Sequence, residues 1–406
     1  DLHTGEVVKR IDTAGAFMRN HHHRCYRNKA TSRYILAGRT GVEFIDTDDG
    51  GGLRHDWIRG TCQYGILPAN GLLYTPPHAC NCYQQAKLNG FLALAPRDGD
   101  SGGPGGAFKD PEQPPRLVRG PAYGEIEGGA DTSGEWPTYR HDSRRSGHTN
   151  TQVSKNLENA WNVSLGNKLT PPVVAGGAVL VAATDAHVVH ALEASSGRRL
   201  WTFRAGGRID SPPTVWRGRV LFGSADGWVY CLRARDGRLV WRFRAAPRER
   251  WIMADNQIES AWPVPGTIMV ENGEAYCVAG RSSYLDDGLH LYRLDIQTGE
   301  KLAHKRIYSR DPETGAQKEG LYVDQGPDDP WGPDKLDMGG GKPDVLSANR
   351  DAIFMRHMQF KRDTLEPLTE LKDFLNWGGD DWRERHPFGH QRYQNPDHHP
   401  HLFSAS

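Results

Sequence analysis

Alternating apolar and polar residues, interrupted by glycine-containing turns, recur along the middle of the chain. Residues 177–243 contain this pattern twice, and each copy ends in a run that includes Trp and Phe. Runs of five or six residues with a period of two, separated by Gly, Asp and Ser, predict β-strands joined by hairpins. A Pro-Pro-Val-Val or Pro-Pro-Thr-Val segment ahead of each copy supplies one more strand. Each unit is therefore expected to contain four strands.

The two copies keep the same spacing. Gly197 and Trp201 of the first copy correspond to Gly237 and Trp241 of the second, at an interval of 40 residues. A repeat of this length, built from short strands and glycine turns, is typical of a β-propeller blade. Residues 270–307 form a third copy, in which Ala303 occupies the tryptophan position. The fold class expected is all-β, with four-stranded antiparallel blades.

The remainder of the chain suggests parts of two propellers. Residues 1–96 contain the last hairpin of one blade and two looser copies, which we interpret as the C-terminal blades of a first propeller. Residues 97–135 are rich in Gly, Pro and polar residues, and we interpret them as a linker without a core of its own. Residues 136–406 are expected to be the N-terminal blades of a second, truncated propeller. Because the chain opens inside a hairpin pattern and stops inside another, we interpret it as an internal fragment.

Composition narrows the possible partners. Lys+Arg and Asp+Glu are equal at 50 each, so no overall positive field would attract nucleic acid or an anionic membrane surface. No apolar run approaches the ~18 residues of a membrane span. With 37% hydrophobic and 25% charged residues, the sequence is ordinary for a globular protein.

The blade endings resemble a known repeat. The pattern A-x-[DE]-x-x-[ST]-G-[KR]-x-x-W, present at 191–201 and one residue shorter at 234–241, is similar to the PQQ-like repeat of quinoprotein alcohol dehydrogenase-like propellers. The segment W-P-x-Y-R-x-D-x-x-R-S-G at 136–147 resembles the start of such propellers in secreted bacterial proteins. The N-terminal part looks like the first propeller of two-propeller PQQ-like proteins of planctomycete type. The resemblance implies a periplasmic or secreted protein.

The resemblance also raises the question of PQQ as a cofactor. Quinoprotein dehydrogenases use two adjacent cysteines beside PQQ, a Ca²⁺ held by Glu, Asn and Asp, and a Trp stacked on the quinone. This sequence has no adjacent cysteine pair; the nearest arrangement is Cys80-Asn81-Cys82. PQQ is therefore suggested only by the resemblance, and the cofactor is left unassigned.

One cluster of candidate site residues lies in the N-terminal part. In a four-stranded blade, the loop between the second and third strands and the crossover to the next blade open at the same end. The repeat places four stretches rich in His, Cys and Arg at that end, where binding sites are usually built. The candidate ligand-binding residues are His22, His23, Arg24, Arg39, Arg59, Gln63 and His78.

These stretches allow three kinds of chemistry. His21, His23 and His78 are candidate ligands for Zn²⁺ or another late transition metal. Alternatively, a histidine acts as general base while arginines clamp a carboxylate or sulfate, which would suit a uronic-acid polysaccharide. In the third interpretation, disulfides such as Cys25–Cys62 hold the loops and the histidines are solvated. Cys231 and Cys277 fall within predicted strands and are expected to be buried thiols.

A second cluster is expected at the corresponding end of the second propeller. Charged residues mixed with aromatic side chains in a concave opening fit a sugar or a small polar ligand. The alternative is a solvated rim of Arg–Asp pairs, each worth less than ~1 kcal/mol. The candidates are Arg208, Asp210, Asp226, Trp228, Arg281 and Tyr284, with Arg250, Gln257, Glu259, Trp262 and Asp286 nearby.

These observations favour a binding function over catalysis. The leading hypothesis is an exported propeller that binds a small polar ligand, a carbohydrate or a protein partner at its loops. The alternatives are a PQQ-dependent alcohol or sugar dehydrogenase, and a polysaccharide-acting enzyme based on His and Arg or on a metal. Because a propeller serves many unrelated activities, the fold alone does not choose among them.

Overall fold

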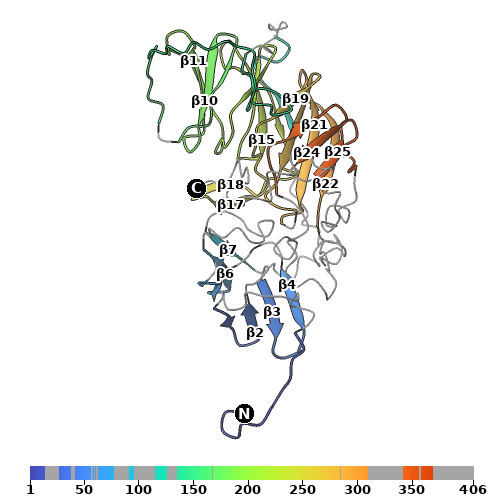
Figure 1. Ribbon diagram of the computed structural model, residues 1–406. Coiled ribbons are helices and arrows are strands. Elements are labelled where there is room, and N and C mark those ends of the chain that lie inside the picture. The colour runs from blue at the N-terminus through green and yellow to red at the C-terminus, as the bar shows by residue number, and fades with distance from the viewer. Residues whose placement is uncertain are drawn as a thin grey trace.

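The described part of the chain consists of β-strands and connecting turns. The computed structural model describes residues 1–13, 27–37, 42–55, 58, 60, 63–76, 91–95, 115–125, 135–166, 168–283, 285–309, 342–355 and 358–368. All regular secondary structure in these ranges is β-strand, and the strands form antiparallel sheets (Figure 1). The expected all-β class is confirmed.

Two sheets lie in the N-terminal part. The first has the order β1 (Lys29–Ala30), β2 (Tyr34–Ala37), β3 (Val42–Asp46) and β4 (Gly52–His55). The second contains β5 (Leu67–Ala69), β6 (Leu72–Thr75) and β7 (Leu92–Leu94). Their apolar side chains form one small cluster that includes Leu36, Val42, Ile66 and Leu73. The two looser sequence copies therefore do form sheets.

The clear repeats form consecutive blades. Blade 1 contains β9 (Val173–Ala175), β10 (Ala178–Ala183), β11 (Val188–Glu193) and β12 (Arg199–Arg204). Blade 2 contains β13 (Thr214–Trp216), β14 (Arg219–Gly223), β15 (Trp228–Arg233) and β16 (Leu239–Arg244). Blade 3 contains β19 (Met269–Glu271), β20 (Glu274–Ala279), β21 (Leu289–Asp295) and β22 (Lys301–Ile307). Blade 4 has three described strands, β23 (Ser347–Ala348), β24 (Ala352–Met355) and β25 (Met358–Lys361).

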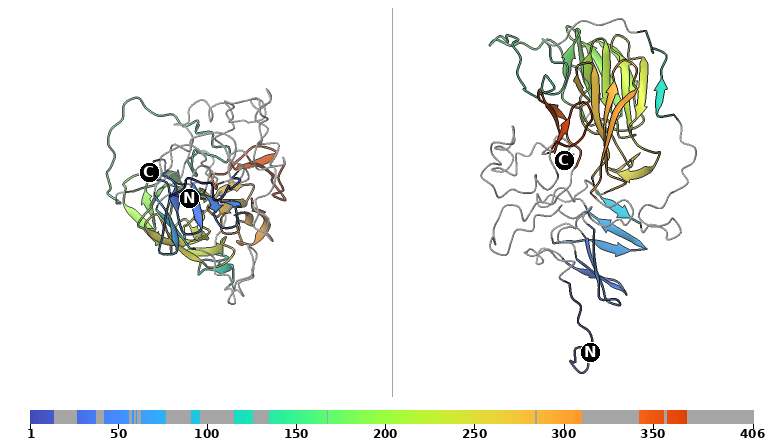
Figure 2. Two further views of the ribbon diagram at one scale, coloured as in Figure 1. Left: turned by 90° about the horizontal axis from the view of Figure 1, so that it is seen from below. Right: turned by 90° about the vertical axis from the view of Figure 1, so that its right-hand side faces the viewer.

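In each blade, sequential strands are hydrogen-bonded neighbours. Seen from below, the blades succeed one another along an arc (Figure 2). The core lies between the blades: one apolar cluster joins blades 1 and 2, a second joins blades 2 and 3, and a third joins blades 3 and 4. This is the radial packing of a propeller, as the repeat predicts.

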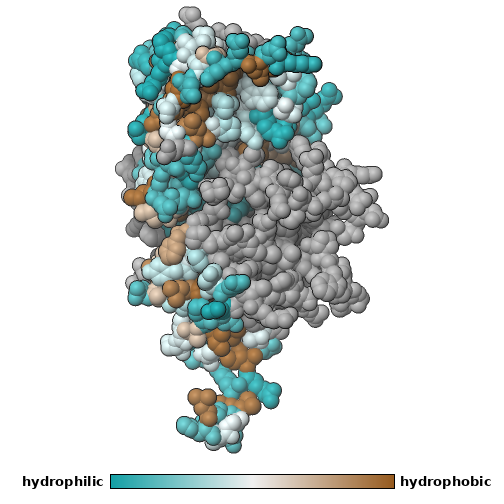
Figure 3. All heavy atoms as spheres, turned by 60° about the vertical axis from the view of Figure 1, so that its left-hand side comes forward, coloured by the Kyte–Doolittle hydropathy of each residue, from teal (hydrophilic) through white to brown (hydrophobic). Residues whose placement is uncertain are grey.

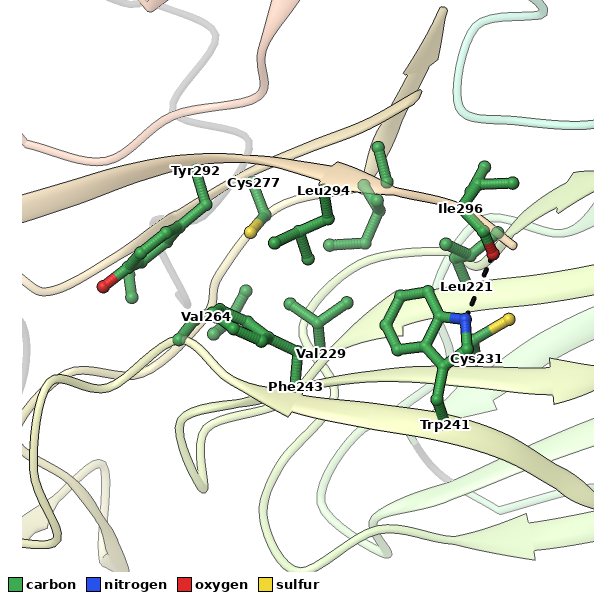
Figure 4. Packing of buried hydrophobic residues seen from close by; sticks show 14 of the residues in the cluster. Leu221, Val229, Cys231, Trp241, Phe243, Val264, Cys277, Tyr292, Leu294 and Ile296 are labelled. Atoms are coloured by element: carbon green, nitrogen blue, oxygen red, sulfur yellow. Dashed lines mark hydrogen bonds between the residues drawn. The ribbon is translucent and has the colours of Figure 1, made fainter. Parts of the chain in front are cut away.

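In blades 1 and 2, a tryptophan of the outer strand contacts the next blade. The indole Nε1 of Trp201 donates to the carbonyl of Ala234 at 2.7 Å, and that of Trp241 donates to Ile296 at 3.1 Å (Figure 4). Each indole lies directly on a turn glycine: a Cβ added to Gly237 would come within 2.6 Å of Trp201. Trp and Gly recur together because the flat ring needs a residue without a side chain beneath it.

The same contact begins one repeat earlier than the sequence suggested. Trp161 donates to the carbonyl of Ala194 at 3.0 Å and covers Gly197. Residues 157–165 therefore lie against blade 1 as an outer strand would, although they pair with no strand among the described residues.

Two blade junctions replace the tryptophan. Ala303 of β22 packs against an apolar cluster that includes Leu365, and Leu365 adopts the glycine position, with a φ of 61° and a hydrogen bond from its N to the carbonyl of Lys361. The large and small side chains have changed places. In the N-terminal part, Lys9 Nζ donates to the carbonyl of Thr47 at 2.6 Å, beside the turn that ends at Gly50. A lysine there makes the hydrogen bond that an indole makes elsewhere.

Part of the expected linker is ordered on the blades, which corrects the expectation that 97–135 takes no part in a core. Within it, β8 (Leu117–Arg119) pairs antiparallel with β16 as a fifth strand of blade 2. Ala122 is fully buried in the cluster between blades 2 and 3. The Gly- and Pro-rich composition of the stretch masks the short apolar run of β8. That run pairs with β16, the edge strand of blade 2.

A two-stranded insertion separates blades 2 and 3. It consists of β17 (Trp251–Ala254) and β18 (Gln257–Ser260), joined by a turn in which Asp255 and Asn256 have positive φ. Together with the coil before blade 1 and the N-terminal tail, this hairpin exposes apolar side chains. Figure 3 shows apolar side chains at the lower tip and beside the upper blades. No helix that could span a membrane occurs among the described residues.

Two stacked histidines on blade 3 predict a loss of stability in acid. His290 and His304 lie 3.0 Å apart between ring nitrogens, with their rings nearly parallel. Burial, then His304 and Arg306, lower the pKa of His290 to about 3; burial, then Lys301 and Arg116, lower that of His304 to about 4. In the unfolded chain both histidines bind protons below pH ~6.5, whereas in the folded chain they stay neutral until a lower pH. The free energy of unfolding should therefore fall as pH drops from ~6.5 towards 4.

The check is the free energy of unfolding in urea as a function of pH. The variant His290→Phe should lose less stability between pH 6.5 and 4.5 than the unmodified protein. His148→Phe, at an exposed histidine, is the matched control and should leave the slope unchanged. An unchanged slope in His290→Phe would contradict the interpretation.

Candidate functional site

The loops of successive blades adjoin at one end of the sheets. The loops between the second and third strands of blades 2 and 3 contact the crossovers next to those blades. Ala225 N donates to the carbonyl of Arg208 at 2.8 Å, and Ser260 N donates to that of Ala225 at 2.8 Å. Ser309 N donates to the carbonyl of Ser283, also at 2.8 Å. We call this end, formed by residues 184–187, 205–213, 224–227, 245–268, 280–283 and 285–288, the mouth.

The β17–β18 hairpin is fastened to the mouth by polar residues of one edge. Asp255 accepts from Arg208 at 2.8 Å, and Gln257 contacts His187 of blade 1 at 2.6 Å. Glu259 reaches both Arg208 and Arg281. The hairpin therefore ties together loops of blades 1 and 3, and in Figure 1 it lies at the lower end of the blades.

The centre of the mouth is an ionic network. Glu259 is 0% exposed and pairs with Arg208 at 3.0 Å and with Arg281 at 2.5 Å. Arg208 also pairs with Asp210 at 3.2 Å. Burial raises the pKa of Glu259 and of Asp210 in spite of these arginines. Burial acts to lower the pKa of Arg208, but its carboxylate neighbours outweigh burial and raise it.

This network contains some of the residues expected in the second cluster of charged and aromatic side chains. The structure brings Arg208, Asp210 and Arg281 together, through Glu259, and their charges are paired with one another. The rim of Arg–Asp pairs expected as the alternative is present, but it is buried rather than solvated. The residues of the mouth do not fit PQQ in this arrangement, because the arginines that would hold its carboxylates are already neutralised by carboxylates of the chain.

Beside the network lies an open groove of about 480 Å³. It runs between the outer strand of blade 1, the outer strands of blade 2 and the start of the hairpin. Its lining combines aromatic rings, guanidinium groups and backbone: Phe203, Arg204, Ala205, Gly206, Asp226, Trp228, Tyr230, Leu239, Arg242, Glu249 and Trp251.

Asp226 forms the floor of this groove. Its carboxylate accepts from the Tyr230 hydroxyl at 2.6 Å, from Gly206 N at 2.9 Å and from Trp228 N at 3.0 Å. Burial raises the pKa of Asp226, and the same carboxylate, with burial, raises that of Tyr230. The residue is held by the chain's own donors and orients the ring of Trp228.

Two tryptophans and two arginines give the groove its binding character. The guanidinium carbon of Arg242 lies 4.3 Å from the ring centroid of Trp228. Trp251, at the start of the hairpin, is 51% exposed. Arg204, at the end of β12, is exposed and donates to the carbonyl of Ala186 at 2.7 Å.

The predicted residues thus fall into four sets. Asp226 and Trp228 line the groove, and Arg208, Asp210 and Arg281 lie in the network. Gln63 is exposed, in a left-handed conformation. The rest of the N-terminal cluster and Tyr284 lie outside the described residues and stay predictions; the N-terminal residues are His21, His22, His23, Arg24, Arg39, Arg59 and His78.

Metal and cysteine expectations can be compared only in part. Among the described residues, no three His, Cys, Asp or Glu side chains are grouped as metal ligands. The proposed metal ligands and the four N-terminal cysteines are outside that range. Cys231 and Cys277 are free, buried thiols in β15 and β20, as expected. Burial raises the pKa of Cys277 to about 12.

The sequence did not single out several groove residues. Phe203, Arg204, Tyr230 and Arg242 belong to strands, whereas we looked for site residues in loops. A signal was available: Arg242 and Arg244 alternate with Trp241 and Phe243 on a strand, so alternate positions carry charge beside the aromatic positions. Trp251 follows two arginines and a glutamate in the inserted crossover. An aromatic residue there is not needed for packing between blades, which points to a binding role.

The repeat segment matches a family model. Residues 152–323 match the model described as outer membrane protein assembly factor BamB. This stretch is therefore a PQQ-like repeat segment of β-propeller type, in agreement with the described blades. A comparison with curated protein sequences gives no match.

Solved structures are similar at low identity. Quinohemoprotein alcohol dehydrogenase ADHIIG from Pseudomonas putida HK5 is 16% identical, with 59% of this chain and 40% of that chain covered and a TM-score of 0.40. The enzyme from Comamonas testosteroni is 20% identical, with 59% and 41% covered and a TM-score of 0.41. BamB from Moraxella catarrhalis is 15% identical, with 84% and 71% covered and a TM-score of 0.34. The chain thus spans about two fifths of the two dehydrogenases.

Proposed function

We propose that this protein is an exported carbohydrate-binding propeller whose ligand lies in the groove beside the mouth. The observation that carries the proposal is the exposed ring of Trp251 in one open groove with the guanidinium groups of Arg204 and Arg242. Aromatic rings offer apolar faces to sugar rings, and nearby polar groups bind the hydroxyls. The groove is open to solvent and could accept part of a longer chain.

The rest of the mouth supports a site at this position. The ionic network and the hairpin fill the centre, so a ligand reaching this end of the blades meets the groove first. The groove walls come from β12, β15 and β16, whose strands are paired along their length. A rigid lining keeps the ordering cost of binding low.

The proposal predicts a specific loss of binding in Trp251→Ala. Removing an exposed stacking ring should weaken saccharide binding by ~1–2 kcal/mol, or about 5- to 30-fold. The measurement is isothermal titration with neutral and acidic oligosaccharides, after an initial glycan screen. The matched control is Met253→Ala, on the same face of the hairpin and 64% exposed but outside the groove lining.

Equal weakening in the two variants would mean that the hairpin is only a structural element. Absence of binding to any saccharide by the unmodified protein would reject the proposal itself.

Catalysis by PQQ is the competing proposal among oxidoreductases. If it were correct, adding PQQ and Ca²⁺ should produce a quinone absorbance and dye-linked oxidation of alcohols or sugars. We expect neither, because the arginines of the mouth are paired internally. Dye-linked activity would place the enzyme hypothesis first.

A further inference from the structure

We infer that the groove selects an acidic saccharide, one that carries carboxylate or sulfate groups, over a neutral one. This inference rests on the proposed function and specifies its ligand. Its basis is the state of the arginines: those in the groove lack acidic partners, whereas those in the mouth have them.

The arginines of the mouth are neutralised. Arg208 pairs with three carboxylates, Arg281 with Glu259, and Arg250 with Asp286 at 2.7 Å. Each guanidinium therefore has a negative charge of the chain within contact distance. No ligand charge is needed to balance them.

The groove arginines differ. Among the described residues, no carboxylate lies within ion-pair distance of Arg204 or Arg242; Arg204 is held by a backbone carbonyl and Arg242 by the ring of Trp228. The Nε of Arg242 is buried without a hydrogen-bond partner, as are those of Arg208 and Arg281, so the difference lies in the carboxylate partners. A guanidinium without a carboxylate partner beside an open groove is the usual partner of a carboxylate or sulfate.

Two acidic residues also line the groove. Asp226 already accepts three hydrogen bonds from the chain, and burial raises its pKa. Glu249 has an interaction of its own. Both guanidinium groups share the groove with the exposed ring of Trp251, on which a sugar would stack.

Stacking prepares Arg242 for recognition. The ring of Trp228 is nearly buried, and its backbone N donates to Asp226. With the guanidinium held over that ring at 4.3 Å, less side-chain freedom is lost when an anion binds. The order Asp226, Trp228, Arg242 is thus a chain of supports that ends in an unpaired charge.

Nucleic acid is the less favoured polyanion. The chain carries equal numbers of acidic and basic residues, so it lacks the broad positive field that phosphate backbones require. Two guanidinium groups beside two tryptophans are better matched to sugar rings with a charge on some units. Nucleotide binding is retained as an outcome of the test.

The test compares two ligands that differ only in charge. A hexamer of galacturonic acid and its fully methyl-esterified form are titrated against the unmodified protein, with a sulfated galactan hexamer and AMP as further probes. We expect the acid to bind about 10- to 100-fold more tightly than the ester, the range for a charged hydrogen bond in a partly shielded site. The preference should shrink as salt rises.

Variants then locate the charge. Arg242→Gln should abolish the preference for the acid while leaving the ester within about twofold, as expected when only charge recognition is removed. Arg242→Lys should restore part of it. Arg238→Gln, at an exposed position of the same blade, should change neither affinity. Trp251→Ala should weaken both ligands equally.

Each outcome supports or contradicts either this inference or the carbohydrate proposal. Equal binding of acid and ester by the unmodified protein would overturn this inference and leave the carbohydrate proposal standing. Binding of neither, with or without sulfate, would overturn both. AMP binding more tightly than either hexamer would replace the saccharide with a nucleotide. The ester comparison needs no variant, so misfolding of Arg242→Gln could not obscure the result.

Discussion

Replacing Gly237 by Ala should destabilise the propeller by ~2–5 kcal/mol, through a collision with Trp201 combined with backbone strain. The added Cβ would lie 2.6 Å from one indole carbon and 2.7 Å from another. The ring cannot retreat easily, because it is buried between blades and its Nε1 is held by the carbonyl of Ala234. The φ of 71° at Gly237 adds strain for any other residue.

The measurement is the free energy of unfolding in urea, supported by hydrogen exchange of blade 2. The matched control is Gly273→Ala in blade 3, where φ is 80° but the nearest atom to a new Cβ is 3.6 Å away. It should lose only the strain, about 1 kcal/mol. Adding Trp201→Ala to Gly237→Ala should cost less than the two single losses combined. Equal losses at Gly237 and Gly273 would show that the indole contact contributes nothing.

Replacing Glu259 by Gln should lower the free energy of unfolding by ~3–5 kcal/mol, the usual effect of removing one partner from a buried ion pair. The carboxylate is 0% exposed and lies between Arg208 and Arg281. Arg208 keeps Asp210 and Asp255, but Arg281 is left without a carboxylate partner among the described residues. The hairpin should loosen from the mouth.

Urea unfolding gives the loss, and proteolysis between β17 and β18 reports the loosening. The control is Glu300→Gln, whose partner Arg119 is 3.7 Å away with both side chains exposed; it should change stability by less than ~1 kcal/mol. A loss in Glu259→Gln no greater than the control would mean that the network is already neutral by proton uptake. The groove test is independent of this result, since Glu259 does not line the groove.

The strands and their turns could be predicted because their causes are local. A period of two in the apolar residues requires a strand with one face against a neighbour, and a glycine with positive φ marks the turn between two strands. The 40-residue spacing of Gly and Trp followed the blades closely, with Trp201 and Trp241 in equivalent places. Asp226 and Trp228 were found for the same reason, since Asp226 lies in the loop between two recognisable strands and Trp228 is the first residue of the second.

Other features depend on which segments meet. Lys9 makes the hydrogen bond that a tryptophan makes in other blades. At another junction a small Ala303 is combined with a large Leu365, because the contact needs only two side chains of complementary size. Arg208 has one acidic partner nearby in the sequence, Asp210, but its other two, Asp255 and Glu259, come from the hairpin. The crossing of the hairpin brings these carboxylates to Arg208 and none to Arg242.

The hairpin itself separates the two kinds of information most clearly. By itself the sequence determined an all-β chain of four-stranded repeats, the blade turns and the buried cysteines, because period, turn residues and burial are properties of short segments. It did not determine the orientation of β17–β18: Met253 and Ile258 face solvent, at 64% and 63% exposure, while Glu259 is buried. Only the tertiary structure decided this, because it places Arg208 and Arg281 of the mouth opposite the face of the hairpin that carries Glu259.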